Sequence, residues 1–169
     1  DLNIALHAGH GEFNRIVTEP GTPKEAEEIT NQAFYLSQKF KTPSIIISDK
    51  HLGESFYTIK DKPKIIKVPK LTKFGRYNSY EKDAEGSATE NPKIINKNIE
   101  ARKKIGEDIE KEAKKFEQYK IYGKKNSKNM IISWGSTKGT ILDAIDGRDV
   151  CYLQILYMKP FPKISKIIQ

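Results

Sequence analysis

The hydrophobic pattern of the first fifty residues predicts a strand, a helix and a second strand. Apolar runs of strand length occur at residues 3–8 and 44–48. Between them, Thr22 is placed as an N-cap, Pro23 occupies the first helical position, and Glu25 stands three residues after the cap, where a capping box requires it. The helix then shows one apolar face, formed by Ala26, Ile29, Ala33, Leu36 and Phe40.

This helix is expected to end at Thr42 and Pro43, just before the second apolar run. Residues 45–47 are all isoleucine, so the run is hydrophobic on both faces of a strand rather than alternating. Such runs are typical of buried parallel strands. We therefore expect a right-handed β-α-β unit with both faces of the sheet covered.

A long helix is predicted to begin at Pro92. Its narrow apolar stripe lies within charged sequence and is formed by Ile95, Ile99, Ile109, Ala113 and Phe116. Because favourable and unfavourable charge spacings are mixed along this segment, we expect a solvated charged face rather than a ladder of ion pairs.

The last forty residues repeat the alternation of strand and helix. Residues 129–133 read as a strand, 134–139 as a turn, 140–145 as a helix that ends near Gly147, and 149–158 as a further strand. The turn is neither a Walker loop nor a GxGxxG loop, so a structural turn is favoured, with anion binding at the following helix N-terminus as the alternative. The fold class expected from both halves is α/β with parallel sheets.

Length and composition fit one compact domain, or parts of two, in a chain of 169 residues that is 37% hydrophobic. Asp1 stands where an initiator Met would be expected, and residues 164–169 stop within an apolar pattern, so we expect an internal piece of a longer polypeptide. No apolar stretch approaches the roughly 20 residues that cross a bilayer, which predicts a soluble chain without a membrane partner. A single cysteine, Cys151, excludes an internal disulfide and a thiolate cluster, and it favours a reducing, cytoplasmic setting.

The net charge of +8 is located mainly on one segment, because residues 93–128 hold twelve Lys or Arg against six Asp or Glu. No aromatic residues for base stacking are interleaved with these lysines, so a solvated helix is favoured over a nucleic-acid surface. A basic binding module without chemistry of its own remains the alternative to an enzyme.

The best candidate for chemistry is the loop GHGEF at residues 9–13. If residues 3–8 are a strand, this loop lies at its carboxyl end, where parallel α/β domains bind their ligands. His10 is then the candidate catalytic residue, since it can bind a carboxylate or transfer a proton near neutral pH. Gly9, Gly11 and Glu12 are the candidate cofactor-binding residues of the same loop. The alternative is a subunit-contact turn in which His10 bonds to backbone.

Six motifs in this order give the chain a family resemblance: GHGEF at 9–13, RIV at 15–17, PGTPKEA at 20–26, TPSIIISD at 42–49, WGSTKG at 134–139 and KPFP at 159–162. Together they resemble the alpha subunit of 2-oxoacid:ferredoxin oxidoreductases and, more distantly, the pyrimidine-binding and C-terminal domains of transketolase-like thiamine enzymes. The resemblance implies a transketolase-like α/β fold in three parts. Residues 1–58 are the last part of the pyrimidine-binding domain, 59–125 the linker and long basic helix, and 126–169 the start of the C-terminal α/β domain.

The resemblance also implies an activity. Such an enzyme oxidatively decarboxylates a 2-oxoacid, transfers the acyl group to coenzyme A and reduces ferredoxin, with thiamine diphosphate doing the carbon chemistry. A partner beta subunit is expected to hold the diphosphate with Mg²⁺ and a [4Fe-4S] cluster, so this chain alone is expected to bind none of them and to be inactive. The family's substrate loop and the glutamate that contacts the aminopyrimidine are absent from the sequence. Residues 82–92 lack the two histidines that relatives carry there, so no role of those histidines is transferred.

Overall fold

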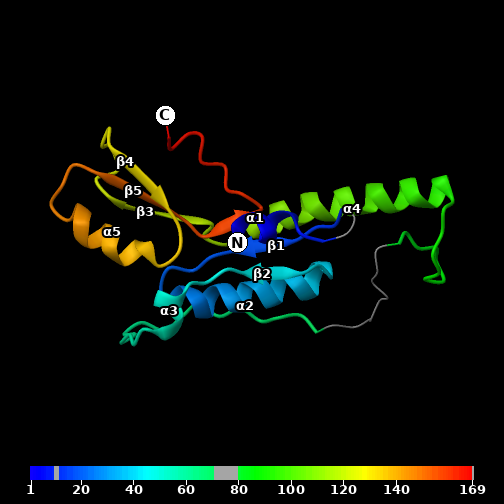
Figure 1. The fold of residues 1–169 in the computed structure, drawn as a ribbon, viewed down its shortest axis with the longest axis horizontal. Helices are drawn as coiled ribbons and strands as arrows, with labels where there is room; N and C mark the ends of the chain where they lie inside the picture. The colour runs from blue at the N-terminus through cyan, green and yellow to red at the C-terminus, as the bar shows by residue number, and fades with distance from the viewer. Residues whose placement is uncertain (10–11, 71–79, 169) are drawn as a thin grey trace.

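Two small mixed sheets form the frame of the molecule, and one stretch of chain takes part in both (Figure 1). The computed structural model describes residues 1–9, 12–70 and 80–168. In chain order the elements are α1 (Leu2–His7), β1 (Ile16–Thr18), α2 (Pro23–Phe40), β2 (Ser44–Ile46), α3 (Lys50–Glu54), α4 (Pro92–Ala113), β3 (Tyr119–Gly123), β4 (Met130–Ser133), α5 (Thr137–Ile145), β5 (Cys151–Ile155) and β6 (Tyr157–Lys159).

The first sheet has the order β2-β1-β6 and the second the order β3-β5-β4. In the first, β1 is parallel to β2 and antiparallel to β6. In the second, β5 is parallel to β4 and antiparallel to β3. The α/β class expected from the sequence is confirmed, but each sheet is mixed rather than wholly parallel.

The strand prediction for residues 3–8 is wrong, because this segment forms helix α1. Leu2, Ala5 and Leu6 follow helical spacing, and all three pack against the core cluster that contains Val17. Ile4, which lies off this face, is 66% exposed. The helical spacing therefore decides the structure, although a short apolar run can also be interpreted as a strand.

The predicted helix between the two strands is α2, and its start is close to expectation. The Thr22 side chain accepts a hydrogen bond from the backbone N–H of Glu25 at 3.3 Å. The Glu25 carboxylate does not complete the capping box, because it accepts instead from the N–H of Gly21 at 2.9 Å. The helix lies between β1 and β2 in sequence, and these strands are parallel, as the β-α-β prediction requires. Strand β2 is half-buried rather than buried, so one of its faces is only partly covered.

The run predicted as one strand, residues 149–158, divides into β5 and β6. β5 is the central strand of the second sheet, and β6 is an edge strand of the first, with Leu156 between them. Every residue of β5 is buried, and so are Leu156 and Tyr157. This buried run therefore connects the two sheets.

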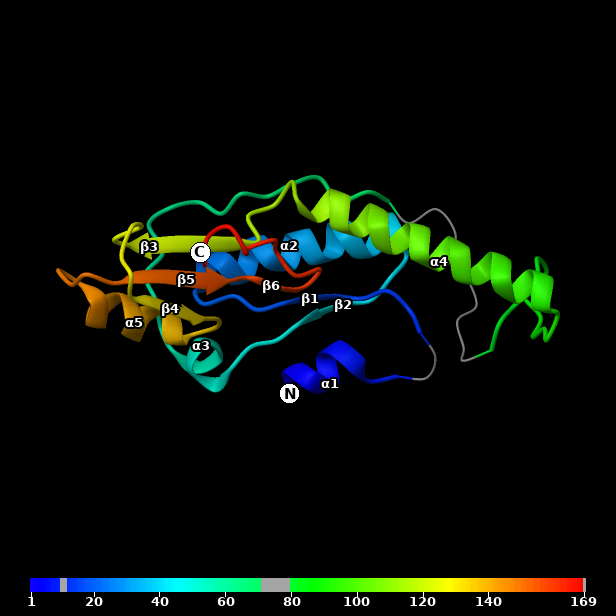
Figure 2. The same cartoon turned by 90° about the horizontal axis from the view of Figure 1, so that it is seen from above.

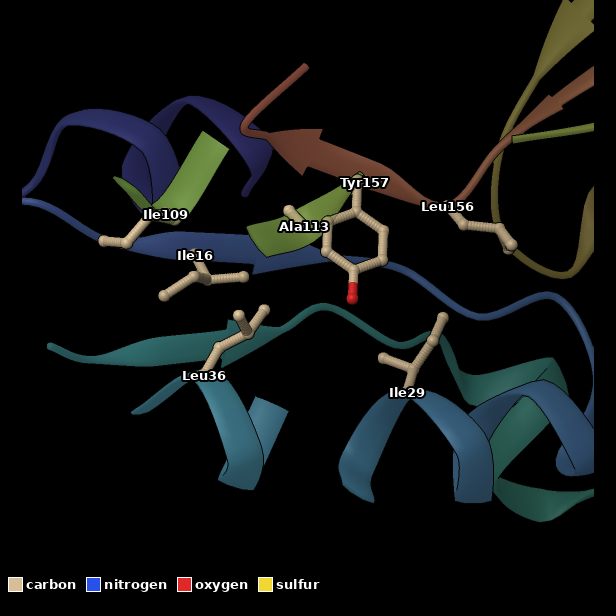
Figure 3. Close-up of a cluster of buried hydrophobic side chains, with 7 residues drawn as sticks. All are labelled: Ile16, Ile29, Leu36, Ile109, Ala113, Leu156 and Tyr157. Atoms are coloured by element: carbon tan, nitrogen blue, oxygen red, sulfur yellow. The ribbon is translucent and has the colours of Figure 1, made fainter. Parts of the chain in front are cut away.

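The main core cluster lies between α2, the first sheet and the C-terminal end of α4. Figure 3 shows its members pointing toward one another: Ile16, Ile29, Leu36, Ile109, Ala113, Leu156 and Tyr157. Of the predicted apolar stripe on α4, Ile109 and Ala113 are buried, whereas Ile95 and Ile99 are half-buried. Figure 2 shows that the N-terminal part of α4 extends beyond the sheets.

The charged face of α4 carries several ion pairs at helical spacing, such as Lys104 with Asp108 at 2.9 Å and Lys103 with Glu100 at 2.7 Å. These side chains are largely exposed, as the expected solvated face requires, but the charges also form ion pairs that the mixed spacings did not indicate. Exposed pairs of this kind stabilise a helix little. No helix of the described residues is long and apolar enough to cross a membrane.

Candidate functional site

The GHGEF loop connects α1 to β1. His10 and Gly11 lie outside the described residues, and Glu12 is exposed. Gly9 has a φ of +120°, and a Cβ at this position would lie 2.9 Å from the Phe13 ring and 3.7 Å from a terminal nitrogen of Arg15. Gly9, Phe13 and Arg15 are therefore close neighbours, and the backbone at residue 9 requires glycine.

Arg15 is a buried cation at the entrance to β1. Its side chain is 6% exposed, its guanidinium lies 4.3 Å from the centre of the Phe13 ring, and it donates one hydrogen bond, to the carbonyl oxygen of Ala5 at 3.2 Å. Among the residues that the structure describes, its Nε has no hydrogen-bond partner. No carboxylate of the described residues forms an ion pair with it. A buried guanidinium with a free N–H can bind a carboxylate or another planar anion.

Arg15 lines a hollow of about 420 Å³ between α1 and the half-buried face of β2. The other lining residues are Asp1, Ile4, Ala5, Ala8, Phe13, Pro43, Ile45 and Ile47. A mostly apolar lining with a few charged groups, here Arg15 and Asp1, has the character of a small-molecule site. The hollow can therefore accept a ligand that has an apolar part and an anionic end.

Two carboxyl groups lie at the carboxyl ends of the parallel pair β1 and β2. Glu19 directly follows β1, and Asp49 follows β2 by three residues. Both approach Gly135, because a Cβ on that glycine would lie 2.5 Å from Glu19 Oε1 and 3.5 Å from Asp49 Oδ2. The two acids are thus brought together from loops that are thirty residues apart in sequence.

The two acids differ in protonation. Burial, together with the nearby charge of Asp49, raises the pKa of Glu19 to about 7. Glu19 Oε2 has no hydrogen-bond partner within the described part of the chain. Burial alone would raise the pKa of Asp49, but hydrogen bonds from the N–H groups of Leu52 and Ser136, at 2.9 and 3.2 Å, lower it below its usual value. Glu19 can therefore take up or release a proton near neutral pH while Asp49 stays ionised.

A third polar group lies next to this pair and joins α2 to the second sheet. Glu25, which is 3% exposed, accepts at Oε1 from Lys138 Nζ at 2.6 Å and from Lys120 Nζ at 2.9 Å. Its Oε2 accepts from Gln154 Nε2 at 2.9 Å. Burial would raise the pKa of Glu25, but these partners lower it to about 2. The lysine of the 134–139 turn is thus bound by a carboxylate of the chain itself, which favours the structural interpretation of that turn over anion binding.

Of the four predicted site residues, the structure describes Gly9 and Glu12. Gly9 lies beside Arg15, Glu12 faces solvent, and His10 and Gly11 fall outside the described residues. Because residues 3–8 are helical, the loop follows a helix and not the carboxyl end of a strand. The catalytic role of His10 and the cofactor-binding roles of Gly9, Gly11 and Glu12 stay predictions.

Sequence reasoning missed Arg15, Glu19 and Asp49. The only signal for the first two was their position, since Arg15 and Glu19 directly flank the segment 16–18, with which the structure buries them. Asp49 carried no comparable signal. Its partner Ser136 is distant in sequence, and only the fold brings the two together.

No metal-binding cluster occurs among the residues that the structure describes, which contain no group of three or more His, Cys, Asp or Glu side chains placed to hold a metal ion. The described residues therefore provide no ligand set for Mg²⁺ or for an iron-sulfur cluster.

Comparison with known proteins gives a consistent result, although no family model matches the chain. The chain is 34% identical over 199 residues to the 2-oxoacid:ferredoxin oxidoreductase subunit alpha of Saccharolobus solfataricus, covering 96% of this chain and 32% of the relative. It is 32% identical over 205 residues to the 2-oxoacid:ferredoxin oxidoreductase 1, subunit alpha, of Sulfurisphaera tokodaii, covering 100% of this chain and 32% of the relative. The chain thus spans about a third of the length of these relatives.

A solved structure with a similar fold is the 2-oxoglutarate:ferredoxin oxidoreductase from Magnetococcus marinus with 2-oxoglutarate, coenzyme A and succinyl-CoA bound. It superposes with a TM-score of 0.70 at 19% identity and covers 98% of this chain and 35% of that chain. At this identity the similarity is evidence for the fold alone.

Proposed function

Since the chain is homologous to about one third of the alpha subunit of 2-oxoacid:ferredoxin oxidoreductases, we propose that it is a portion of such a subunit. The observation that carries this proposal is the 32–34% identity with named alpha subunits over nearly the whole chain. The complete enzyme would oxidatively decarboxylate a 2-oxoacid to an acyl-CoA and reduce ferredoxin, in a cytoplasmic setting.

The cofactors of this proposal are thiamine diphosphate with Mg²⁺ and a [4Fe-4S] cluster. Thiamine diphosphate, when bound, supplies the carbanion chemistry at the 2-oxo carbon. The described residues do not fit the Mg²⁺ or the cluster. We therefore assign both the Mg²⁺ and the cluster to a beta subunit.

The chain itself would supply structure on the pyrimidine side of the cofactor and at the subunit interface. We divide it as residues 1–58, the end of a pyrimidine-binding domain; 59–125, a linker and long helix; and 126–169, the start of a C-terminal α/β domain. Strands β1 and β2 lie in the first part and β4 and β5 in the third. The sheets nevertheless cross these boundaries, because β3 of the second part belongs to the second sheet and β6 of the third part completes the first sheet.

Arg15 is the residue for which the geometry best supports a role in this function. A 2-oxoacid has a carboxylate beside its keto group and, in most cases, an apolar chain. The hollow lined by Arg15, Ile45 and Ile47 offers a cation for the first and an apolar wall for the second. Gly9 lies beside Arg15. His10 lies outside the described residues, and its role in proton transfer or carboxylate binding stays a prediction.

The complete alpha subunit, assembled with its beta subunit, tests this proposal. We expect 2-oxoacid- and coenzyme-A-dependent reduction of a viologen dye. His10→Ala removes one contact worth about 2 to 4 kcal/mol, so turnover per bound cofactor should fall roughly 30- to 1000-fold. Arg15→Met should instead act mainly on the KM for the 2-oxoacid, because it removes binding of a group that does not itself react.

His51→Ala is the matched control, since His51 is an exposed histidine of α3. If His10→Ala lowers the melting temperature while turnover stays normal, GHGEF is a structural turn. If the assembled parent enzyme shows no 2-oxoacid-dependent reduction at all, the proposed function itself is wrong.

A further inference from the structure

A segment without helix or strand structure, residues 55–67, runs alongside α2 on the outside of the molecule (Figure 1). We call it the strap. Its backbone is hydrogen-bonded to side chains of α2. The Asn31 side chain accepts from the N–H of Ile66 at 2.8 Å and donates to the carbonyl oxygen of Ile66 at 3.0 Å. The N–H of Lys64 donates to Glu28 at 2.9 Å. The strap is therefore held on the helix although most of its side chains face solvent.

The strap exposes large apolar side chains. Phe56 is fully exposed, and the exposed fractions of Tyr57, Ile59 and Ile65 are 47%, 47% and 55%. Phe34, on the neighbouring face of α2, is 58% exposed. Between helix and strap lies a groove of about 460 Å³, lined by Ala26, Glu27, Thr30, Asn31, Phe34 and Ile65. Gathered apolar side chains of this size on a surface indicate an interaction site.

The charges around these side chains indicate which partner fits. Within the strap, four lysines, Lys60, Lys62, Lys64 and Lys67, stand against one acid, Asp61. Asp61 is itself within 3.5 Å of Lys24. On α2, Glu28 accepts from the strap backbone and Glu27 lines the groove, so the excess of positive charge remains on the strap. The complementary partner has an acidic face with an apolar centre.

The residue types favour a transient partner over a permanent subunit. Lysine is depleted from the cores of stable interfaces, whereas lysines at a rim increase the rate of encounter through long-range attraction. Complexes between redox partners are likewise weak and have small interfaces. The strap carries two exposed aromatic residues, Phe56 and Tyr57, followed by four lysines, and this composition suits such an encounter.

We propose that the strap and the adjacent face of α2 form a docking surface for an acidic electron-carrier protein, which in the complete enzyme is ferredoxin. This proposal rests on the proposed function, because ferredoxin enters through the names of the relatives. Docking here serves to raise the local concentration of the carrier, and no electron-transfer step is assigned to the strap itself.

The test compares two electron acceptors with the complete enzyme. Ferredoxin must dock, whereas methyl viologen is small and needs no docking surface. The variant Lys60→Glu/Lys62→Glu should raise the KM for ferredoxin about tenfold at low ionic strength and leave the viologen rate unchanged. The difference should shrink as salt is added, because salt screens exposed charges.

The control is Lys93→Glu/Lys97→Glu, which makes the same charge change at the far end of α4. Both lysines are exposed, and this end lies away from the strap (Figure 2). An equal rise in the KM for ferredoxin in both variants would overturn the docking surface in favour of a general charge effect. An unchanged KM in the strap variant would also overturn it.

Direct titration of ferredoxin onto the assembled subunits measures docking without turnover. A salt-dependent affinity that falls about tenfold in the strap variant supports the surface even if the assay conditions give no activity. If the parent enzyme reduces viologen but the strap variant binds ferredoxin normally, the docking surface is wrong while the proposed function stands. If no 2-oxoacid reduces either acceptor and no ferredoxin binds, both proposals fall together.

Discussion

Replacing Glu25 by Gln keeps the size of the side chain but removes the negative charge that Lys138 and Lys120 share. Lys138 is 8% exposed, so its ammonium group would be left buried without a counter-charge. Breaking a buried pair in this way typically costs about 3 to 5 kcal/mol. We expect Glu25→Gln to lower the free energy of unfolding by that order in a denaturant titration. The control Glu110→Gln, at an exposed position of α4, should change it by less than about 0.5 kcal/mol.

Glu19 makes stability depend on pH in the opposite sense from an ordinary paired acid. Its pKa is about 7 in the folded chain against a reference of 4.5, so the folded state holds the proton more tightly than the unfolded state. The contribution of Glu19 to stability is therefore greatest below about pH 4.5 and is lost as pH rises from there through 7. We expect Glu19→Gln to be more stable than the parent at pH 8, by at most about 3 kcal/mol, and to lose this advantage near pH 4. Equal differences at both pH values in urea unfolding would contradict it, and Glu12→Gln is the exposed control.

Glu25 contributes the opposite pH dependence, because its pKa is lowered to about 2. That contribution is present above about pH 4.5 and is lost as pH falls toward 2. The two acids thus change the free energy of unfolding in different pH ranges. Glu25 acts below about pH 4.5, and Glu19 acts between about pH 4.5 and 7.

Among the elements, α2 could be predicted almost completely and α1 could not. The limits of α2 follow from local chemistry, a Thr cap, a Pro at the first position and an apolar face over eighteen residues. α1 has only six residues, too few for periodicity to separate helix from strand. The division of residues 149–158 between two sheets was not predictable either, because every residue from 151 to 157 is buried and no polar residue marks Leu156 as the point of change.

The same limit applies to the candidate site. The loop GHGEF stands out by its composition and Gly9 lies beside the buried Arg15, but the role of the loop stays a prediction. The pairing of Glu19 with Asp49 and of Glu25 with Lys138 depends on how β1, β2 and α5 come together. That arrangement is a property of the fold and is not encoded in any short segment.

Helix α4 provides a prediction at the scale of elements, because only its C-terminal end packs on the core. Ile109 is 3% exposed and lies in the main cluster, where the Tyr35 hydroxyl also donates to Glu112 at 2.7 Å. Ile109→Ala should destabilise the chain by about 2 to 4 kcal/mol through the cavity it leaves. Ile95→Ala, at the same helix's half-buried N-terminal end, should cost less than about 1.5 kcal/mol. Similar losses in thermal unfolding would show that α4 is packed along its whole length.

At the scale of the whole molecule, three features meet where the two sheets join. The buried run from β5 to β6 passes from one sheet to the other, Glu25 links α2 to β3, β5 and α5, and the Glu19–Asp49 pair approaches the turn after β4. All three fix the orientation of one sheet against the other. The hollow lies beside the first sheet and the turn belongs to the second sheet. This junction fixes the position of one relative to the other, and the buried charged side chains are located at it.

The isolated chain should associate with itself, because the structure leaves apolar edges uncovered. Ile131, Ile132 and Trp134, in and after the edge strand β4, are 37%, 43% and 42% exposed, and Ile45 and Ile47 line the open hollow beside β2. Edge strands with apolar side chains are surfaces on which other strands pair. Sedimentation velocity over a range of concentrations should show oligomers of the 169-residue chain. Ile131→Lys/Ile132→Glu should shift the distribution toward monomer, whereas Lys125→Glu/Lys128→Glu, on the exposed β3–β4 turn, should not. A concentration-independent monomer with sharp cooperative unfolding would mean that these faces need no cover from the rest of a larger subunit.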